Sequence, residues 1–220
     1  MTLSLRGSRP RSATFGATAE IAFQQPLHSV DVVLYKLCQP EIHRESVPRP
    51  RLGQTRRMVT LRPQTTEDLP LLTGNDNPFD DFGPQAPRDS PSSSDLDAAG
   101  GLAVVTDDGQ TAGSVSWHWN QWGPNAGSRC PMIGIWLRPE YRGRGMGTAA
   151  QLQLVRLLFR HTTTNRVEAH TDLANVAEQR ALQAAGFQRE GIIRGAQWRD
   201  GTHRDGILYG VLRADPRPPA

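Results

Sequence analysis

The sequence is poor in cysteine and lacks long apolar runs. Cys38 and Cys130 are its two cysteines among 220 residues, and neither has a second Cys or a His at the spacing of a structural zinc site. No stretch approaches the roughly 18 consecutive apolar residues that a membrane helix needs. These absences argue against a zinc domain and an integral membrane protein. We expect a protein of the reducing cytoplasm, with no metal and no membrane partner.

The positive charge of the chain is concentrated in its first 57 residues. That stretch holds nine Lys and Arg against four Asp and Glu, whereas the remainder holds 16 against 18. A slightly negative domain has no long-range attraction for a polyanion, so we do not expect it to bind nucleic acid in general. The first residues contain Arg and Ser but lack the apolar core of a secretory signal, and export is therefore not expected either.

The pattern of a folded domain begins at Met58. Residues 1–57 contain scattered apolar residues, several Pro and Arg, and one strand-like run at 30–37, so we interpret them as a basic, irregular extension. From Val59 the chain alternates apolar and polar residues, and Thr65 with Asp68 forms the capping box of a short helix. We predict one domain over 58–215 and a tail over 216–220.

Within that domain, strand patterns alternate with two helical patterns. Strands are predicted at 59–62, 102–105, 113–120, 132–137 and 165–171, followed by two more that are split near Asp200 and Gly201. Helices are predicted directly after a glycine-rich turn near residue 146 and at 175–185, and the Asp-, Pro- and Ser-rich segment 75–97 is predicted to be a surface loop. This order predicts a mixed α/β fold.

The glycine-rich turn is the most informative segment of the chain. It covers 137–148, Leu-Arg-Pro-Glu-Tyr-Arg-Gly-Arg-Gly-Met-Gly-Thr, between a predicted strand and a predicted helix. Three glycines at alternate positions allow several backbone N–H groups to point toward one ligand. The helix that follows adds the positive end of its dipole, and Arg142 and Arg144 add charge. Such a turn is suited to a phosphate or a pyrophosphate.

Three other kinds of glycine turn would have to share this spacing. A Walker loop requires a Lys after its glycines, which this turn lacks, and a Rossmann turn requires Gly where Thr148 stands. A turn that only links a strand to a helix is the third alternative. Arg142, Gly145 and Gly147 match the Arg-x-x-Gly-x-Gly pattern by which GNAT acetyltransferases hold the pyrophosphate of coenzyme A. On this motif the chain resembles the GNAT family.

The resemblance extends over 58 to about 215 and points to the branch that includes the acetyltransferases of ribosomal-protein N-termini. Its further motifs are 166–172, Asn175-Val176-Ala177-Glu178, Ala185-Gly186-Phe187, and Arg189-Glu190-Gly191 with Arg194 and Asp205. The resemblance implies a mixed, mostly antiparallel sheet of about seven strands, flanked by helices, with splayed central strands. It also implies acetyl-CoA as co-substrate, without a metal. The implied coenzyme A contacts are Ile135, Leu137, Arg142, Gly143, Arg144, Gly145, Met146, Gly147, Thr148 and Asn175.

Acetyl transfer to an amine needs a base for the amine proton and a proton for the leaving thiolate, but no covalent enzyme intermediate. Glu168, His170 and His118 are candidate bases because each is titratable and lies on a strand predicted to border the cleft. The resemblance places the base of the ribosomal-protein branch near Gln197, which cannot accept a proton at neutral pH. The Tyr that other members use as an acid corresponds to Leu182 here.

Asn175 and Glu178 have two compatible interpretations. Asn at a helix N-cap with Glu three residues later is a capping box, which stabilises a helix by about 1 kcal/mol. By resemblance, Asn175 also contacts the acceptor or the pantetheine arm. Glu178 stands where the ribosomal-protein members often carry a Ser that is proposed to protonate the thiolate. Glu178 is therefore a candidate acid as well as a capping residue.

The acceptor is expected to meet an aromatic side chain. Trp117 and Trp119 alternate on the strand 113–120 and are more typical of a core. Trp122 follows in a turn that contains Gly and Asn, so we predict that it walls the acceptor cleft. Such a wall favours a compact amine with an apolar body, either a small molecule or a protein N-terminus.

The sequence therefore predicts an acetyl-CoA-dependent N-acetyltransferase of the cytoplasm, and it leaves a homodimer open. Two alternatives remain. Leu182 and Gln197 allow a non-catalytic, regulatory module that binds acyl-CoA. The basic extension allows a nucleic-acid-associated protein.

Overall fold

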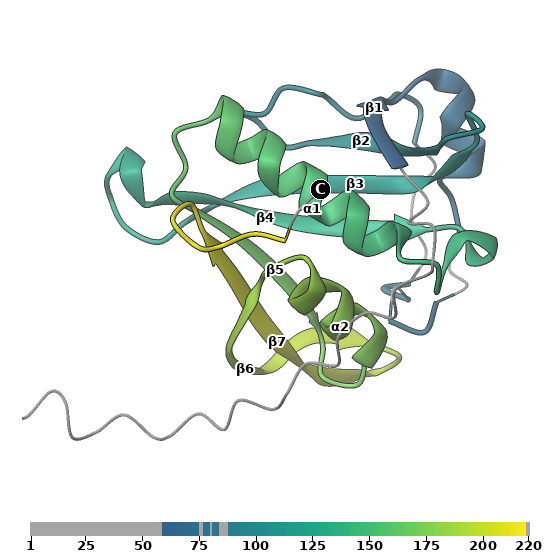
Figure 1. The fold of residues 1–220 in the computed structure, drawn as a ribbon. Coiled ribbons are helices and arrows are strands. Elements are labelled where there is room, and N and C mark those ends of the chain that lie inside the picture. The colour runs from purple at the N-terminus through teal and green to yellow at the C-terminus, as the bar shows by residue number, and fades with distance from the viewer. Residues whose placement is uncertain (1–58, 75–76, 80, 84–87, 219–220) are drawn as a thin grey trace, which may run out of the picture. The chain divides into compact units, whose positions relative to one another are not determined.

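The computed structural model describes residues 59–74, 77–79, 81–83 and 88–218. The predicted extension over 1–57, with its strand-like run at 30–37, lies outside the described residues, as does Met58. The predicted limits of the domain therefore stay a prediction. In the described part, one seven-stranded sheet carries two α-helices (Figure 1).

The sheet has the predicted mixed, mostly antiparallel character. Its strands are β1 (Val59–Pro63), β2 (Gly100–Thr106), β3 (Thr111–Gln121), β4 (Arg129–Leu137), β5 (Arg166–Asp172), β6 (Gln188–Arg199) and β7 (Thr202–Leu212). They lie in the order β1-β2-β3-β4-β5-β7-β6. β4 and β5 pair in parallel, and every other neighbouring pair is antiparallel. The predicted fold class is confirmed.

The parallel pair is short. Its register joins Met132 with Glu168 and Ile133 with Ala169. Beyond these residues, 134–137 of β4 stays paired with β3, and 170–172 of β5 stays paired with β7. Each strand therefore follows its outer neighbour, and the sheet opens between them.

Both α-helices cover one face of the sheet (Figure 1). α1 (Met146–His161) contacts β1, β3 and β4, and α2 (Val176–Ala184) contacts β5 and β6. α1 presents an apolar residue to the sheet at every fourth position. Ala150, Leu154 and Leu158 are accordingly fully buried. Trp117 joins this core at 2 % exposure, and Trp119 packs against it.

Three 3-10 helices complete the described elements: η2 (Thr66–Leu71), η3 (Ala126–Ser128) and η4 (Pro139–Tyr141). η2 begins at the predicted capping box, where the Thr65 N–H donates to the Asp68 carboxylate over 2.8 Å. The same carboxylate, 2 % exposed, accepts bonds from both terminal nitrogens of Arg62, at 2.6 and 2.8 Å, and from the Thr111 hydroxyl at 2.7 Å. Asp68 therefore ties η2 to β1 and β3.

We predict that Asp68→Asn lowers the free energy of unfolding at neutral pH by about 1–3 kcal/mol, because Arg62 loses its ionic partner. The bonds from Arg62 hold the pKa of Asp68 well below its ordinary value of 3.8. A depressed folded-state pKa stabilises the fold above the unfolded value and loses that contribution as the pH falls below it. Urea titrations should therefore show the wild type and the variant converging below about pH 4. Glu67→Gln, at an exposed neighbour, is the control, and a pH-independent difference for Asp68→Asn contradicts the assignment.

Candidate active site

A cleft of about 700 Å³ lies where β4 and β5 separate. Successive side chains of a strand point to opposite faces of the sheet. Ile135 and Leu137 of β4 pack toward the helices, whereas Gly134 and Trp136 face the other side, and all four line the cleft. The cleft therefore passes from the helical face of the sheet to the opposite face.

The glycine-rich turn forms the helical side of this cleft. Gly143 and Gly145 have φ angles of +69° and +79°, in the left-handed region that favours glycine. A Cβ at either position would meet no atom within 4 Å, so the backbone conformation and not crowding requires glycine there. Gly145 is the N-cap of the 16-residue helix α1, whose first N–H groups have no partner within the helix. This geometry fits a pyrophosphate.

Arg142 connects the turn to the end of β4, because its Nε donates to the Leu137 carbonyl over 2.8 Å. Eight of the predicted coenzyme A contacts line the cleft: Ile135, Leu137, Arg142, Gly143, Gly145, Gly147, Thr148 and Asn175. Met146 is instead a core residue, at 1 % exposure. Arg144 is exposed and lies outside the cleft lining. Their contacts with coenzyme A stay predictions.

His170 lies on the opposite wall, on β5. Burial lowers the pKa of His170 below its ordinary value of 6.5, and the nearby charge of Arg199 lowers it further, against an opposing effect of Asp172. Both the burial and the charge of Arg199 favour the neutral form of the ring. Its Nε2 is buried without a hydrogen-bond partner among the described residues and lies so close to Gly206 that a Cβ there would overlap it. Nδ1 lies 3.4 Å from the Gln197 amide nitrogen, from which it can accept a hydrogen bond.

Glu178 borders the same cleft from the first turn of α2. Its backbone N–H donates to the Asn175 side chain over 3.2 Å, which confirms Asn175 as the N-cap. Its carboxylate accepts a bond of 2.5 Å from Gln151 of α1, a cleft residue that is 1 % exposed. The sequence offered a signal for Gln151, because it is an uncharged polar residue beside the apolar face of its helix.

Glu168 and Trp122 lie together in a second pocket, of about 420 Å³. Glu168 is fully buried and accepts bonds from Arg166 Nε at 2.7 Å, Trp122 Nε1 at 2.8 Å and Asn120 Nδ2 at 3.2 Å. Cys130 lines the same pocket, where burial and the neighbouring Glu168 raise its thiol pKa to about 11. The structure thus places neither Glu168 nor Trp122 at the main cleft.

His118, the remaining candidate base, is exposed on β3, outside the lining of both cavities. Of the four candidate catalytic side chains, the main cleft brings together His170 and Glu178. Sequence reasoning missed the aromatic side chains of its far side, Phe79, Phe82 and Trp136. The two Phe residues are the large apolar residues of a segment otherwise rich in Asp, Pro and Ser, and this is the signal that could have found them.

Comparison with known proteins decides the family. The family model described as "Acetyltransferase (GNAT) domain" matches residues 58–188. The chain belongs to the GNAT acetyltransferase family. Bacillus subtilis YdaF, which carries the name of a ribosomal N-acetyltransferase, is 29% identical over 108 residues, 49% of this chain and 57% of that protein. B. subtilis YjcK, named as an N-acetyltransferase, is 31% identical over 38% of this chain and 46% of its own. The chain thus spans about half the length of these curated relatives.

Solved structures agree on the fold. Spermidine N-acetyltransferase from Vibrio cholerae, in complex with CoA and spermine, matches with a TM-score of 0.58 at 19% identity, over 72% of this chain and 97% of that one. A further acetyltransferase crystal structure matches with a TM-score of 0.56 at 24% identity, over 75% and 90%. At these identities the likeness shows the GNAT fold alone.

None of the helices among the described residues is both long and apolar enough to cross a membrane. Nor do these residues include a group of three or more His, Cys, Asp or Glu side chains arranged to hold a metal ion.

We predict that Gly145→Glu abolishes acetyl-CoA binding in this GNAT domain, because a carboxylate at the mouth of the turn repels the pyrophosphate. Gly109→Glu is a matched control: Gly109 has a φ of +81° and equally open surroundings, but lies in the β2–β3 turn. Both variants should lose about 1–2 kcal/mol of stability from backbone strain. Calorimetry should show coenzyme binding only in the Gly109 variant. Equal affinity in both contradicts the assignment.

We predict that Glu168→Gln lowers the free energy of unfolding by about 1–3 kcal/mol, because a buried carboxylate with three donors is replaced. Glu190→Gln should cost under about 1 kcal/mol, since that side chain is 36 % exposed where it pairs with Arg166. Chemical denaturation measures both variants. Wild-type stability of Glu168→Gln, combined with a loss of acetyl transfer, would return Glu168 to the list of bases.

Proposed function

We propose that this chain transfers an acetyl group from acetyl-CoA to a primary amine by direct attack of the amine on the thioester. The observation that carries the proposal is the cleft through the sheet. The glycine-rich turn at the start of α1 lies on its helical side, and the half-buried imidazole of His170 lies on its other side. Two reactants that enter from opposite faces would meet between β4 and β5.

Gly143, Gly145 and the first turn of α1 would hold the pyrophosphate with backbone N–H groups, and Arg142 would add charge. The strand edge at 134–137 has no partner strand on its β5 side in the described pairing. The backbone near Ile135 and Leu137 is therefore available to the pantetheine arm. A backbone N–H in this stretch would polarise the thioester carbonyl as negative charge develops on its oxygen.

The amine must lose a proton as it attacks. An α-amine titrates near a pKa of about 8, so a weak base suffices. We assign this role to His170, which borders the cleft and whose pKa is lowered by burial; its Nδ1, beside the Gln197 amide, is the proposed nitrogen. Glu178, held by Gln151 on the helical side, is the proposed position from which a proton returns to the thiolate. Proximity of the two reactants supplies much of the rate enhancement.

The class of amine is a further part of the proposal. The name of YdaF favours a ribosomal acceptor, and the V. cholerae structure holds spermine, a polyamine. We propose a cytoplasmic location on the strength of these relatives. The alternative of a non-catalytic acyl-CoA-binding module predicts coenzyme binding without thiol release in the presence of any amine.

We predict that His170→Gln lowers kcat/KM for the amine by about 100-fold or more, the usual contribution of a general base, with the affinity for acetyl-CoA unchanged. His118→Gln separates the two imidazoles, because His118 is exposed outside both cavities. It should change kcat/KM by less than about twofold. The reverse order of effects would assign the base to His118.

The pH profile gives the second measurement on this pair. Because the pKa of His170 lies below 6.5, the acid limb of kcat/KM should fall below that pH in the wild type. The part of the limb that His170 contributes should vanish in His170→Gln, whereas the part that comes from protonation of the amine itself should remain. A limb that persists unchanged in this variant contradicts the role of His170.

A further inference from the structure

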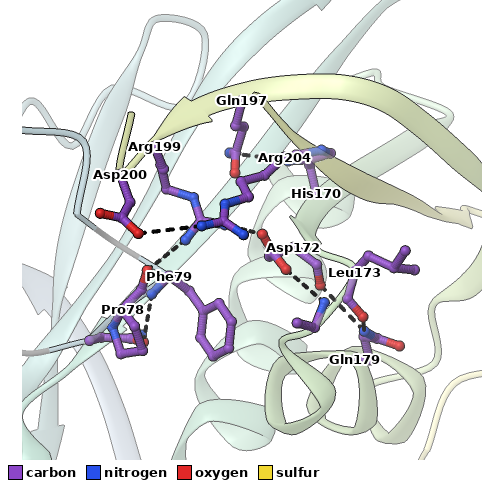
Figure 2. A network of polar contacts seen from close by, with 12 residues as sticks. Pro78, Phe79, His170, Asp172, Leu173, Gln179, Gln197, Arg199, Asp200 and Arg204 are labelled. Carbon is purple, nitrogen blue, oxygen red and sulfur yellow. Dashed lines mark hydrogen bonds and ion pairs between the residues drawn. The ribbon is translucent and has the colours of Figure 1, made fainter. Parts of the chain in front are cut away.

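A buried ion pair supports the far side of the cleft. Arg199 of β6 and Asp172 of β5 are 4 % and 7 % exposed, and their side chains form an ion pair. Nη1 of Arg199 also donates to the Pro78 carbonyl over 2.6 Å. Figure 2 shows Arg199 between Asp172 and the chain at Pro78 and Phe79. One guanidinium therefore joins two strands of the sheet to a segment about 120 residues away in the sequence.

The same guanidinium orients two aromatic rings. Its central carbon lies 5.8 Å from the ring centroid of Phe79 and 5.9 Å from that of Phe82. Both rings line the cleft, as does Trp136 of β4. The side of the cleft that His170 borders thus has an aromatic wall, made of Phe79, Phe82 and Trp136, and Arg199 holds two of its three members.

Arg199 also determines the charge of this side. Among the described residues that line it, Asp172 is the one carboxylate. Its Oδ2 pairs with Arg199, and its Oδ1 accepts the Ala174 N–H over 2.6 Å. The other polar groups there, Asn77 and Gln197, are uncharged. A second ammonium group on the acceptor would therefore lose its hydration without gaining an anionic partner.

We propose that Arg199 is the positioning residue that sets acceptor specificity, by holding the aromatic wall and neutralising Asp172, and that the acceptor is a monoamine with a flat apolar body. This inference rests on the proposed acetyl transfer. Flat rings bind such a body through their large apolar area. Polyamines are disfavoured, since each further cationic centre would need a carboxylate of its own.

The ion pair also bears on His170. The charged side chains on the strands around His170 include Asp172 and Glu168 on β5, Arg199 on β6 and Arg204 on β7. Arg199 lowers the pKa of His170, and Asp172 raises it. Loss of Arg199 alone leaves Asp172 unopposed, so the pKa of His170 rises. Loss of both charges removes the two opposing effects together.

The test compares four variants of the full chain with phenethylamine and spermidine as acceptors. Arg199→Gln should lower the ratio of the kcat/KM for phenethylamine to the kcat/KM for spermidine by at least about tenfold. It should also move the acid limb of the kcat/KM pH profile to higher pH. The double variant Asp172→Asn/Arg199→Gln should return the acid limb toward the wild-type pH. Its ratio of the two kcat/KM values should stay low. Phe82→Ala, at a ring 48 % exposed, should lower kcat/KM for phenethylamine without moving the limb. Trp198→Ala, at a 60 % exposed ring outside the cleft lining, is the matched aromatic control and should change neither.

The acetyl-CoA affinity of every variant should stay within about twofold of wild type, because none of these residues belongs to the anion-binding turn. A wild type that prefers spermidine contradicts this inference alone, as does a Phe82→Ala variant with unchanged kinetics. A folded Arg199→Gln variant in which both the ratio of the two kcat/KM values and the acid limb are unchanged also contradicts this inference alone. If the wild type binds acetyl-CoA but releases no thiol with any amine of a broad panel, the proposed function fails as well.

Discussion

The site depends on how few residues join β4 to β5. Two pairs, Met132 with Glu168 and Ile133 with Ala169, hold the strands together before each follows its outer neighbour. A longer ladder would close the sheet and leave coenzyme and amine on separate faces. The buried cluster at Glu168, with donors from Arg166, Trp122 and Asn120, lies at this junction. We interpret it as the structural support of the paired end, opposite the open one.

The two faces of the opening differ in their electrostatics. On the helical face, Gly143, Gly145 and the N-terminus of α1 present backbone N–H groups, which are suited to negative charge. On the other face, burial lowers the pKa of His170, and Arg199 pairs with the charge of Asp172. This asymmetry suits a reaction in which an anionic co-substrate and a neutral amine approach from opposite sides.

The sequence predicted the local features of this arrangement and missed the distant ones. Short sequence patterns predict the succession of strands along the chain, the Asn175 cap and the turn around Gly145. These patterns are the alternation of apolar and polar residues, an Asn at a helix N-cap, and glycines at left-handed backbone positions. Eight of ten predicted coenzyme contacts line the cleft for the same reason. The side chain of Met146 enters the core, which the turn pattern did not predict, and its contact with coenzyme A stays a prediction.

Contacts across the sheet carried no comparable signal. The bond from Trp122 to Glu168 joins residues 46 positions apart, and that from Arg199 to Pro78 joins residues 121 apart. Only the strand register decides that Glu168 points into a second pocket while His170, two residues later, borders the cleft. The aromatic wall likewise depends on an irregular segment that has no periodicity to read.

The central claim is that coenzyme and amine meet through the opening between β4 and β5 from opposite faces of the sheet. A crystal structure with a bisubstrate conjugate, in which coenzyme A is joined through an acetyl linker to phenethylamine, tests it most directly. The account predicts the pyrophosphate on the turn at Gly143 and Gly145, the linker beside Leu137, and the phenyl group near His170 and Phe82. A conjugate with both halves on the helical face, or with its amine end in the pocket of Glu168 and Trp122, would contradict it.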